Sequence, residues 1–200
     1  MRTANPDLQA QRRREIIAAS EQCFLQRGFH QTSMQNIATA SGLSMGLLYR
    51  YFANKEAIIT AVAQQDQDAS LTAISALPNT GDVVAAWATL LTEMAAVASS
   101  PDYTVLASEI LAEANRSPKI MQTLRNSDAE LAVAIVQKLT EQQRAGAIAP
   151  RGDMDATAWL LMALFDGVVM RMVMTDIQRV DPVETHIQTI TSSILGLRRK

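Results

Sequence analysis

Apolar residues recur along most of the chain with the spacing of an α-helix, and short polar stretches with Gly or Pro separate these runs. The pattern predicts an all-α protein of about nine helices. In order, the expected helices cover residues 7–27 (ending at Gly28), two short helices within 32–51, then 54–77, 82–99, 101–114, 118–145, 153–175, and a last helix after Asp181-Pro182.

The two short helices lie on either side of Gly42. Thr32 or Ser33 can cap the first of them, and Ser44 can cap the second. Leu47, Leu48 and Tyr51 in the second helix are spaced to pack inward. Two short helices joined by a turn with Gly are typical of a helix-turn-helix, whose second helix enters the major groove of DNA.

The stretch from Leu48 to Ile58 reads LYRYFANKEAI, and Gly28-Phe29, Thr32-Ser33 and Ile37-Ala38 lie upstream of it. With these residues, positions 12–62 resemble the DNA-binding domain of the TetR family of transcriptional repressors. The resemblance implies a helix-turn-helix domain over residues 1–62, and a ligand-binding and dimerisation domain over residues 63–200. The fourth helix, to about residue 77, would connect the two.

The resemblance also implies roles for residues of the DNA-binding domain. Tyr49 and Lys55 match the family's phosphate-contacting tyrosine and lysine, and Lys55 would act together with the N–H groups at a helix start. The hydroxyls of Thr32, Ser33 and Ser44 can bind phosphate, or can serve only as helix caps. The candidate base-reading residues are Gln35, Met45, Gly46 and Arg50, and Arg50 can take either guanine or phosphate. Leu47, in the same helix, is a further candidate DNA-binding residue.

Charge is distributed unevenly, although the net charge is only −2. Residues 1–60 carry seven Arg and Lys against four Asp and Glu, a balance of +3, which leaves −5 for the rest. Such asymmetry is expected when one end of a protein binds phosphates. Arg12, Arg13 and Arg14 cover more than one face of the first helix, so at least one of them should reach toward a DNA phosphate. Any single one of them could instead belong to a solvated helix end.

The second domain should hold a small, largely apolar or amphipathic effector, as the family's variable domain does. The candidate lining residues are Trp87, Met94, Tyr103, Met121, Trp159, Met162, Phe165 and Asp166, any of which could instead be ordinary core. Asp166 is the one carboxylate in a long apolar run, and it could meet a cationic ligand group or bond across a dimer interface. Glu109 and Glu113 fall off the apolar stripe of their helix, so we expect them to be solvated.

The helix over residues 153–175 is apolar nearly all round, but Asp166 and Arg171 within it argue against a membrane span. In the TetR family the last two helices pair with their copies across a two-fold axis, so the resemblance implies a homodimer through these helices and no membrane partner. The lone Cys23 favours a buried hydrophobe over a redox sensor. The N-terminus has no apolar run of signal-peptide type, which favours a cytoplasmic protein.

Enzyme function is not expected, because the chain has two His, one Cys and none of the HExxH, CxxC or GxSxG motifs. No cofactor or metal is implied. The sequence therefore predicts a dimeric repressor that binds palindromic operator DNA and is released by an effector. The alternative is a helical protein-protein interaction module, which would have little need for Tyr49, Lys55 and a basic first helix.

Overall fold

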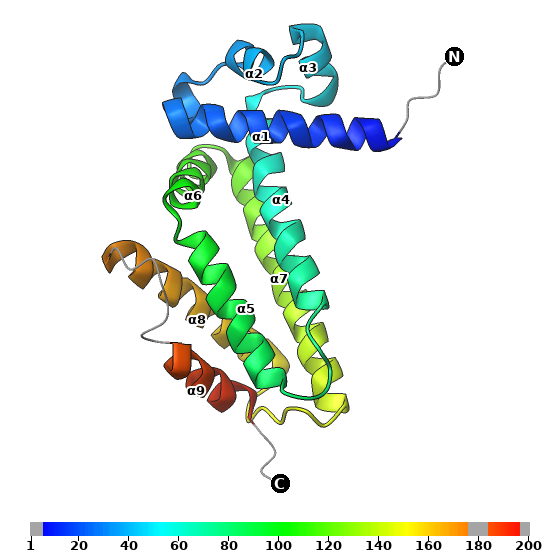
Figure 1. Cartoon of the computed structure of the whole chain (residues 1–200), viewed down its shortest axis with the longest axis vertical. Coiled ribbons are helices and arrows are strands. Elements are labelled where there is room, and N and C mark those ends of the chain that lie inside the picture. The colour runs from blue at the N-terminus through cyan, green and yellow to red at the C-terminus, as the bar shows by residue number, and fades with distance from the viewer. Residues whose placement is uncertain (1–5, 176–183, 197–200) are drawn as a thin grey trace. The chain divides into compact units, whose positions relative to one another are not determined.

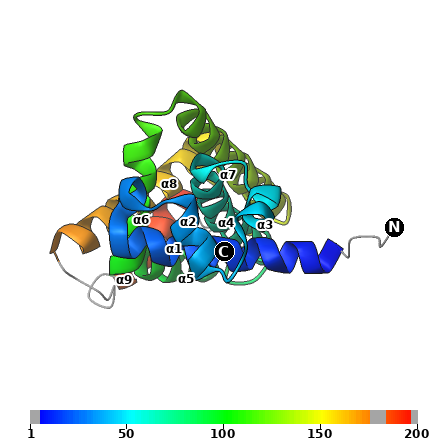
Figure 2. The same cartoon turned by 90° about the horizontal axis from the view of Figure 1, so that it is seen from above.

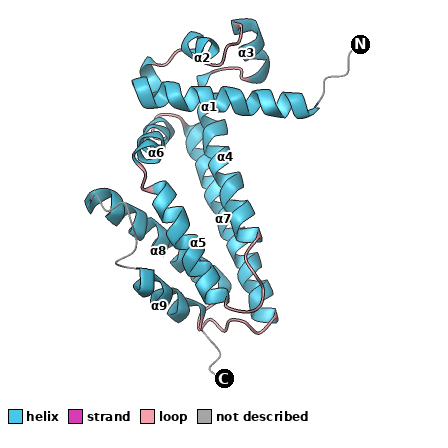
Figure 3. Cartoon of the chain, in the orientation of Figure 1, coloured by secondary structure: helices cyan, strands magenta, loops and turns pink. Residues whose placement is uncertain are grey.

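The computed structural model describes residues 6–175 and 184–196, and within these ranges the chain forms nine α-helices (Figures 1 and 3). The expected all-α class is confirmed. Asp181-Pro182, after which the last helix is predicted, lies outside the described residues. The helices are α1 (Pro6–Gln31), α2 (Met34–Ala40), α3 (Met45–Tyr51), α4 (Lys55–Ser75), α5 (Val83–Ala98), α6 (Pro101–Ala114), α7 (Pro118–Arg144), α8 (Met154–Thr175) and α9 (Glu184–Leu195).

The chain divides into two compact units. The head unit comprises Met1–Asp66 together with Val105–Leu124, and the body unit comprises Gln67–Thr104 with Arg125–Lys200. The head unit therefore includes a segment, 105–124, that lies within the predicted ligand-binding domain of residues 63–200. That segment holds the end of α6 and the start of α7, far in sequence from α1–α4.

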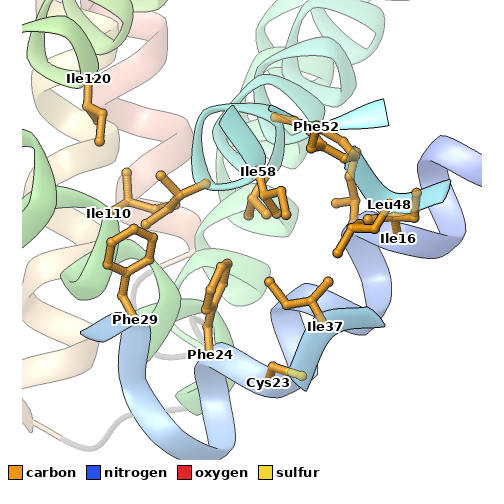
Figure 4. Packing of buried hydrophobic residues seen from close by; sticks show 14 of the residues in the cluster. Ile16, Cys23, Phe24, Phe29, Ile37, Leu48, Phe52, Ile58, Ile110 and Ile120 are labelled. Carbon is orange, nitrogen blue, oxygen red and sulfur yellow. The ribbon is translucent and has the colours of Figure 1, made fainter. Parts of the chain in front are cut away.

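In the head unit, α2 packs against both α1 and α3 (Figures 1 and 2). One core joins them: Ile16 and Phe24 of α1, Ile37 of α2, Leu48 of α3 and Ile58 of α4 are each no more than 1% exposed. Figure 4 shows Ile110 of α6 and Ile120 of α7 in the same cluster. Cys23 is buried among these side chains, as expected, and burial raises the pKa of its thiol.

Gly28 ends the regular part of α1. Its backbone has φ 73° and ψ 164°, a conformation that essentially only glycine adopts, so helical geometry is interrupted there as the sequence predicted. One short helical turn follows before α2. At the start of α4, Asn54 caps the helix by accepting a hydrogen bond from the Ala57 N–H, with Oδ1 at 2.9 Å.

In the body unit, α5, α8 and α9 pack on one another around a second core. Trp87 is 2% exposed, and its indole N–H donates to the Gln142 Oε1 of α7 at 2.9 Å. The Gln142 amide in turn donates to the Pro78 carbonyl at 2.8 Å, so the loop after α4 is tied to α7. Every polar group of this buried pair therefore has a partner, which buried polar groups require.

Among the described helices, α8 alone is by itself long and apolar enough to cross a membrane, with a mean hydropathy of 1.6 over its most apolar window. Length and composition are weak grounds for a span, because core helices of soluble proteins reach the same length and hydropathy. Thr157, Ala158, Leu161 and Met172 of α8 are buried inside the body unit. Asp166 and Arg171 also lie within the helix, where a bilayer would strongly disfavour them.

Candidate DNA interface and effector unit

The two helices of the helix-turn-helix begin at serine caps. The Ser33 Oγ accepts a hydrogen bond from the Asn36 N–H at 3.1 Å, while the Asn36 Oδ1 accepts from the Ser33 N–H at 2.9 Å, which is a reciprocal capping box. The Ser44 Oγ accepts from the Leu47 N–H at 3.3 Å and caps α3. Gly42, at φ 67°, makes the turn between them.

The short helix α3 has one buried side and one exposed side. Leu48 is 0% exposed, and the half-buried Met45 and Tyr51 also pack against the head core. Gly46, Tyr49 and Arg50 are exposed, and their spacing of three and four residues places them on one outward face. Tyr49 is 50% exposed, and nothing lies within 4 Å of a Cβ built on Gly46.

Other expected DNA contacts differ in accessibility. Gln35 of α2, Ser33 and Ser44 are exposed, and Leu47 is half-buried. Thr32 is 1% exposed, and its hydroxyl lies 2.8 Å from the Gly28 carbonyl oxygen and 3.1 Å from that of Cys23. The Thr32 hydroxyl therefore fixes the end of α1 and does not reach the surface.

Lys55 is the expected phosphate ligand with the most contacts inside the protein. Its Nζ donates to the carbonyl oxygens of Phe29, Thr32 (2.7 Å) and His30 (3.3 Å), and it lies 4.2 Å from the centroid of the Phe29 ring. An ammonium group has three hydrogens, and three carbonyls take them. A phosphate contact by Lys55 would require it to leave one of these carbonyls.

The arginines of α1 are also partly engaged. Arg12 forms a 2.7 Å ion pair with Glu15, one turn further along the helix. The Arg13 guanidinium carbon lies 4.4 Å from the centroid of the Phe52 ring, directly after α3. Arg13 thus packs on the residue that caps the C-terminus of α3. Arg14 is exposed.

The expectation that both α6 glutamates are solvated is wrong. Glu113 is 8% exposed, with Oε1 at 2.9 Å from the His30 Nε2 and 2.8 Å from the Arg116 Nη1. The Glu109 Oε2 accepts a hydrogen bond from the Phe29 N–H at 2.8 Å. Glu109 and Glu113 are one turn apart on α6, but nothing in the sequence identified the partner of Glu109, 80 residues earlier.

Burial and charge oppose each other at Lys55. Partial burial lowers the pKa of its ammonium group, because a charged group loses hydration there. The nearby Glu113 and Glu109 carboxylates act in the other direction and raise it. The lysine and the two glutamates therefore depend on one another electrostatically.

The structure does not gather the eight candidate effector residues into one pocket. Trp87 is in the body core, and Met162 and Phe165 are half-buried against that core, but Met121 packs on the head core. Met94 and Tyr103 are half-buried. Trp159 is 68% exposed on α8, so its indole faces away from the interior of the isolated chain.

Asp166 of α8 is exposed as a residue, yet partial burial raises the pKa of its carboxyl, and the carboxylate of Asp128 on α7 raises it further. A positive charge near the two carboxylates would be favoured for the same reason. Within the described ranges, no group of three His, Cys, Asp or Glu side chains is placed to hold a metal ion.

Surface pockets in the described part of the body unit are lined by other residues. One, of about 340 Å³, lies between α8 and α9 and includes Arg151, Ala156, Leu160 and Ile190. Another, of about 390 Å³, includes Leu77, which follows α4, and Ala86 and Leu90 of α5.

Comparison with known proteins identifies the family. Residues 16–62 match the profile of the bacterial regulatory proteins of the tetR family, and residues 88–196, more than half of the chain, match that of the BetI-type transcriptional repressor C-terminal domain. The chain belongs to the TetR family of transcriptional regulators. The predicted family, the DNA-binding regulatory function and the absence of an enzyme role are thereby confirmed.

Relatives in this family match over nearly the whole chain. The regulator UidR of Escherichia coli (strain K12) is 29% identical over 171 residues, 84% of each chain. The repressor Rv1474c of Mycobacterium tuberculosis is 24% identical over 172 residues, 86% of this chain and 88% of its own. The structure of Salmonella enterica GusR has a TM-score of 0.76 and 29% identity, covering 98% of this chain and 99% of its own.

Proposed function

We propose that this TetR-family regulator binds a near-palindromic operator as a homodimer and acts as a repressor that a small effector releases. The observation that carries the DNA-binding part is the two-sided α3, anchored by the fully buried Leu48 while Gly46, Tyr49 and Arg50 face outward. An outward face of a short helix, placed by its neighbours, is what major-groove recognition requires.

The proposed contacts divide into two kinds. Tyr49, Ser33 and Ser44 would bind backbone phosphates, which fix the register without reading sequence. Gln35 and Arg50 would read base edges, since an amide pairs bidentately with adenine and a guanidinium with guanine. Gly46 would allow the backbone to approach the DNA closely. Met45 and Leu47 would make apolar contact with a thymine methyl group.

We place the dimer interface on α8 and α9, because large apolar side chains are exposed there in the single chain. Trp159, Leu160, Met170 and Met174 of α8 are 46–71% exposed, and Ile190 of α9 is 45% exposed. Exposed apolar surface of this kind marks a site of association. A two-fold dimer would place two copies of α3 on successive half-sites.

The effector is proposed to be small and largely apolar, and to bind in the body unit near Trp87, Met162 and Phe165, with Met94 and Tyr103 at its edge. Other proteins with this fold were crystallised with stearoyl-CoA (FadR from Bacillus subtilis) and with choline (a regulator from Saccharomonospora viridis), at 18% and 20% identity. The carboxylates of Asp166 and Asp128 would favour an effector with a cationic group. The regulator would act in the cytoplasm, where its operator is.

The test is fluorescence anisotropy of the purified protein on DNA from upstream of its own gene, against a scrambled duplex and at several salt concentrations. We expect specific binding about 10³-fold or more tighter than binding to the scramble. If the protein shows no specific binding to the upstream DNA, its site is selected from random duplexes. The absence of any specifically bound duplex after that selection would refute the proposal. An effector must then both raise the melting temperature and release the operator.

A further inference from the structure

The segment Gly28–Thr32 comprises the end of α1 after its interruption at Gly28 and the residue before the cap of α2. Because Gly28 leaves helical geometry, the Phe29 N–H turns away from the helical hydrogen-bond pattern of α1 and meets Glu109 Oε2 at 2.8 Å. The same carboxylate lies beside Gly28, where a Cβ would be 3.2 Å from Glu109 Oε1. A glycine and a distant glutamate thus define one conformation of this connection.

Lys55 holds the other side of the same segment. Its ammonium group takes the carbonyl oxygens of Phe29, His30 and Thr32, at the C-terminal end of α1, where a helix presents its negative end. Thr32 directly precedes Ser33, the cap of α2. Lys55 therefore holds the carbonyl group of the residue that precedes the cap of α2.

Glu113 completes the arrangement one turn beyond Glu109. It is nearly buried and bonds the His30 side chain and Arg116, so the backbone segment is held at Phe29 and again through His30. Lys55 and Arg116 offset the charges of the two glutamates. We name Lys55, Glu109 and Glu113 the connection clamp.

We propose that the connection clamp positions the helix-turn-helix for operator recognition, and that Lys55 acts through the segment Gly28–Thr32 rather than by contacting phosphate. The clamp residues are positioning residues, because their side chains bond the segment Gly28–Thr32 and Arg116. This inference rests on the proposed operator binding.

Positioning has a signature that differs from phosphate contact. Specific binding needs Gln35, Tyr49 and Arg50 placed accurately against base edges and phosphates, whereas non-specific binding depends mainly on how many phosphates are neutralised. Loosening the start of α2 should therefore weaken operator binding and leave non-specific binding nearly unchanged.

The experiment compares Glu109→Ala, Glu109→Gln and Lys55→Gln with the full-length wild type, on a selected operator and on a scrambled duplex. Glu109→Gln keeps an oxygen that can accept from the Phe29 N–H. Glu93→Gln and Lys119→Gln are matched controls, because both side chains are exposed and lie outside the clamp. The active fraction of each preparation is fixed by stoichiometric titration.

We expect Glu109→Ala and Lys55→Gln to weaken operator binding about tenfold, the effect of losing one hydrogen bond to a charged group, with scramble binding within about twofold of wild type. Glu109→Gln should recover most of the loss. A weaker salt dependence for Lys55→Gln, by about 0.9 in the slope for each lost phosphate contact, would instead make Lys55 a phosphate ligand and overturn its part. Unchanged dissociation constants with a lower active fraction would show a purely structural role and overturn the inference.

Hydrogen exchange of the free protein tests the clamp without DNA, so it separates failure of the clamp from failure of operator binding. Amides of residues 29–43 should exchange faster in Glu109→Ala than in wild type, with α5 and α8 unchanged. Equal exchange in residues 29–43 would overturn the inference even if the wild type binds its operator.

Discussion

Replacing Leu48 with alanine should strongly destabilise the head unit. Leu48 is 0% exposed and packs in the core that contains Ile16, Ile37 and Ile58. The substitution removes three carbon atoms, which at about 0.8 kcal/mol each lose about 2.4 kcal/mol of transfer free energy. The cavity left behind raises the total to about 3–5 kcal/mol, because the surrounding side chains close it only in part.

Leu47 offers a matched control, since it is the preceding residue of the same helix. Alanine there removes the same three atoms from a half-buried position, so we expect a loss below about 1 kcal/mol. Leu47 is in the proposed DNA face, so its replacement should lower operator affinity more than stability. Replacing Leu48 should lower both operator affinity and stability, because α3 loses its anchor.

Urea denaturation followed by circular dichroism measures the two free energies of unfolding, with the midpoints compared at equal slopes. Operator affinity is measured by anisotropy at a temperature where each variant is folded. Equal losses of stability in the two variants, or a loss below about 1 kcal/mol for Leu48→Ala, would refute the view that Leu48 anchors α3.

Three further outcomes are expected. Arg50→Ala should relax discrimination at particular operator base pairs, by about 1–3 kcal/mol each, and uniform weakening across a panel of operator mutants would make Arg50 a phosphate contact. Trp159→Asp should shift the dimer toward monomer in sedimentation experiments over a range of concentrations, and an unchanged dimer would remove this part of α8 from the interface. Burial raises the pKa of the Asp66 carboxyl above its ordinary value of 3.8, so the folded state binds this proton more tightly than the unfolded state does. The free energy of unfolding of the wild type therefore declines as the pH rises from the ordinary pKa through the raised one. Asp66→Asn should therefore raise the melting temperature at pH 7 but not below about pH 3, and a gain that persists at the lower pH would contradict this reasoning.

The sequence by itself determined the helices and the helix-turn-helix. Helical periodicity and caps depend on residues three or four positions apart, so the turn at Gly42 and the cap Ser44 could be assigned from local pattern alone. The first cap could only be narrowed to Thr32 or Ser33, and the structure selects Ser33. The spacing of the apolar residues in α3 also predicted the inward positions of Leu48 and Tyr51, but it was wrong for Leu47, because Met45 packs against the head core instead. The family was recognisable because its motif is contiguous between Leu48 and Ile58.

Only the tertiary structure decided what these residues contact. Glu109 and Phe29 are 80 positions apart, and no periodicity within α6 indicates which part of the chain its polar face will meet. The same is true of Lys55, whose charge is directed to three carbonyls of a distant turn. Trp87 and Trp159 both occupy apolar helical stretches, yet one is buried and the other exposed, because burial depends on how the helices pack.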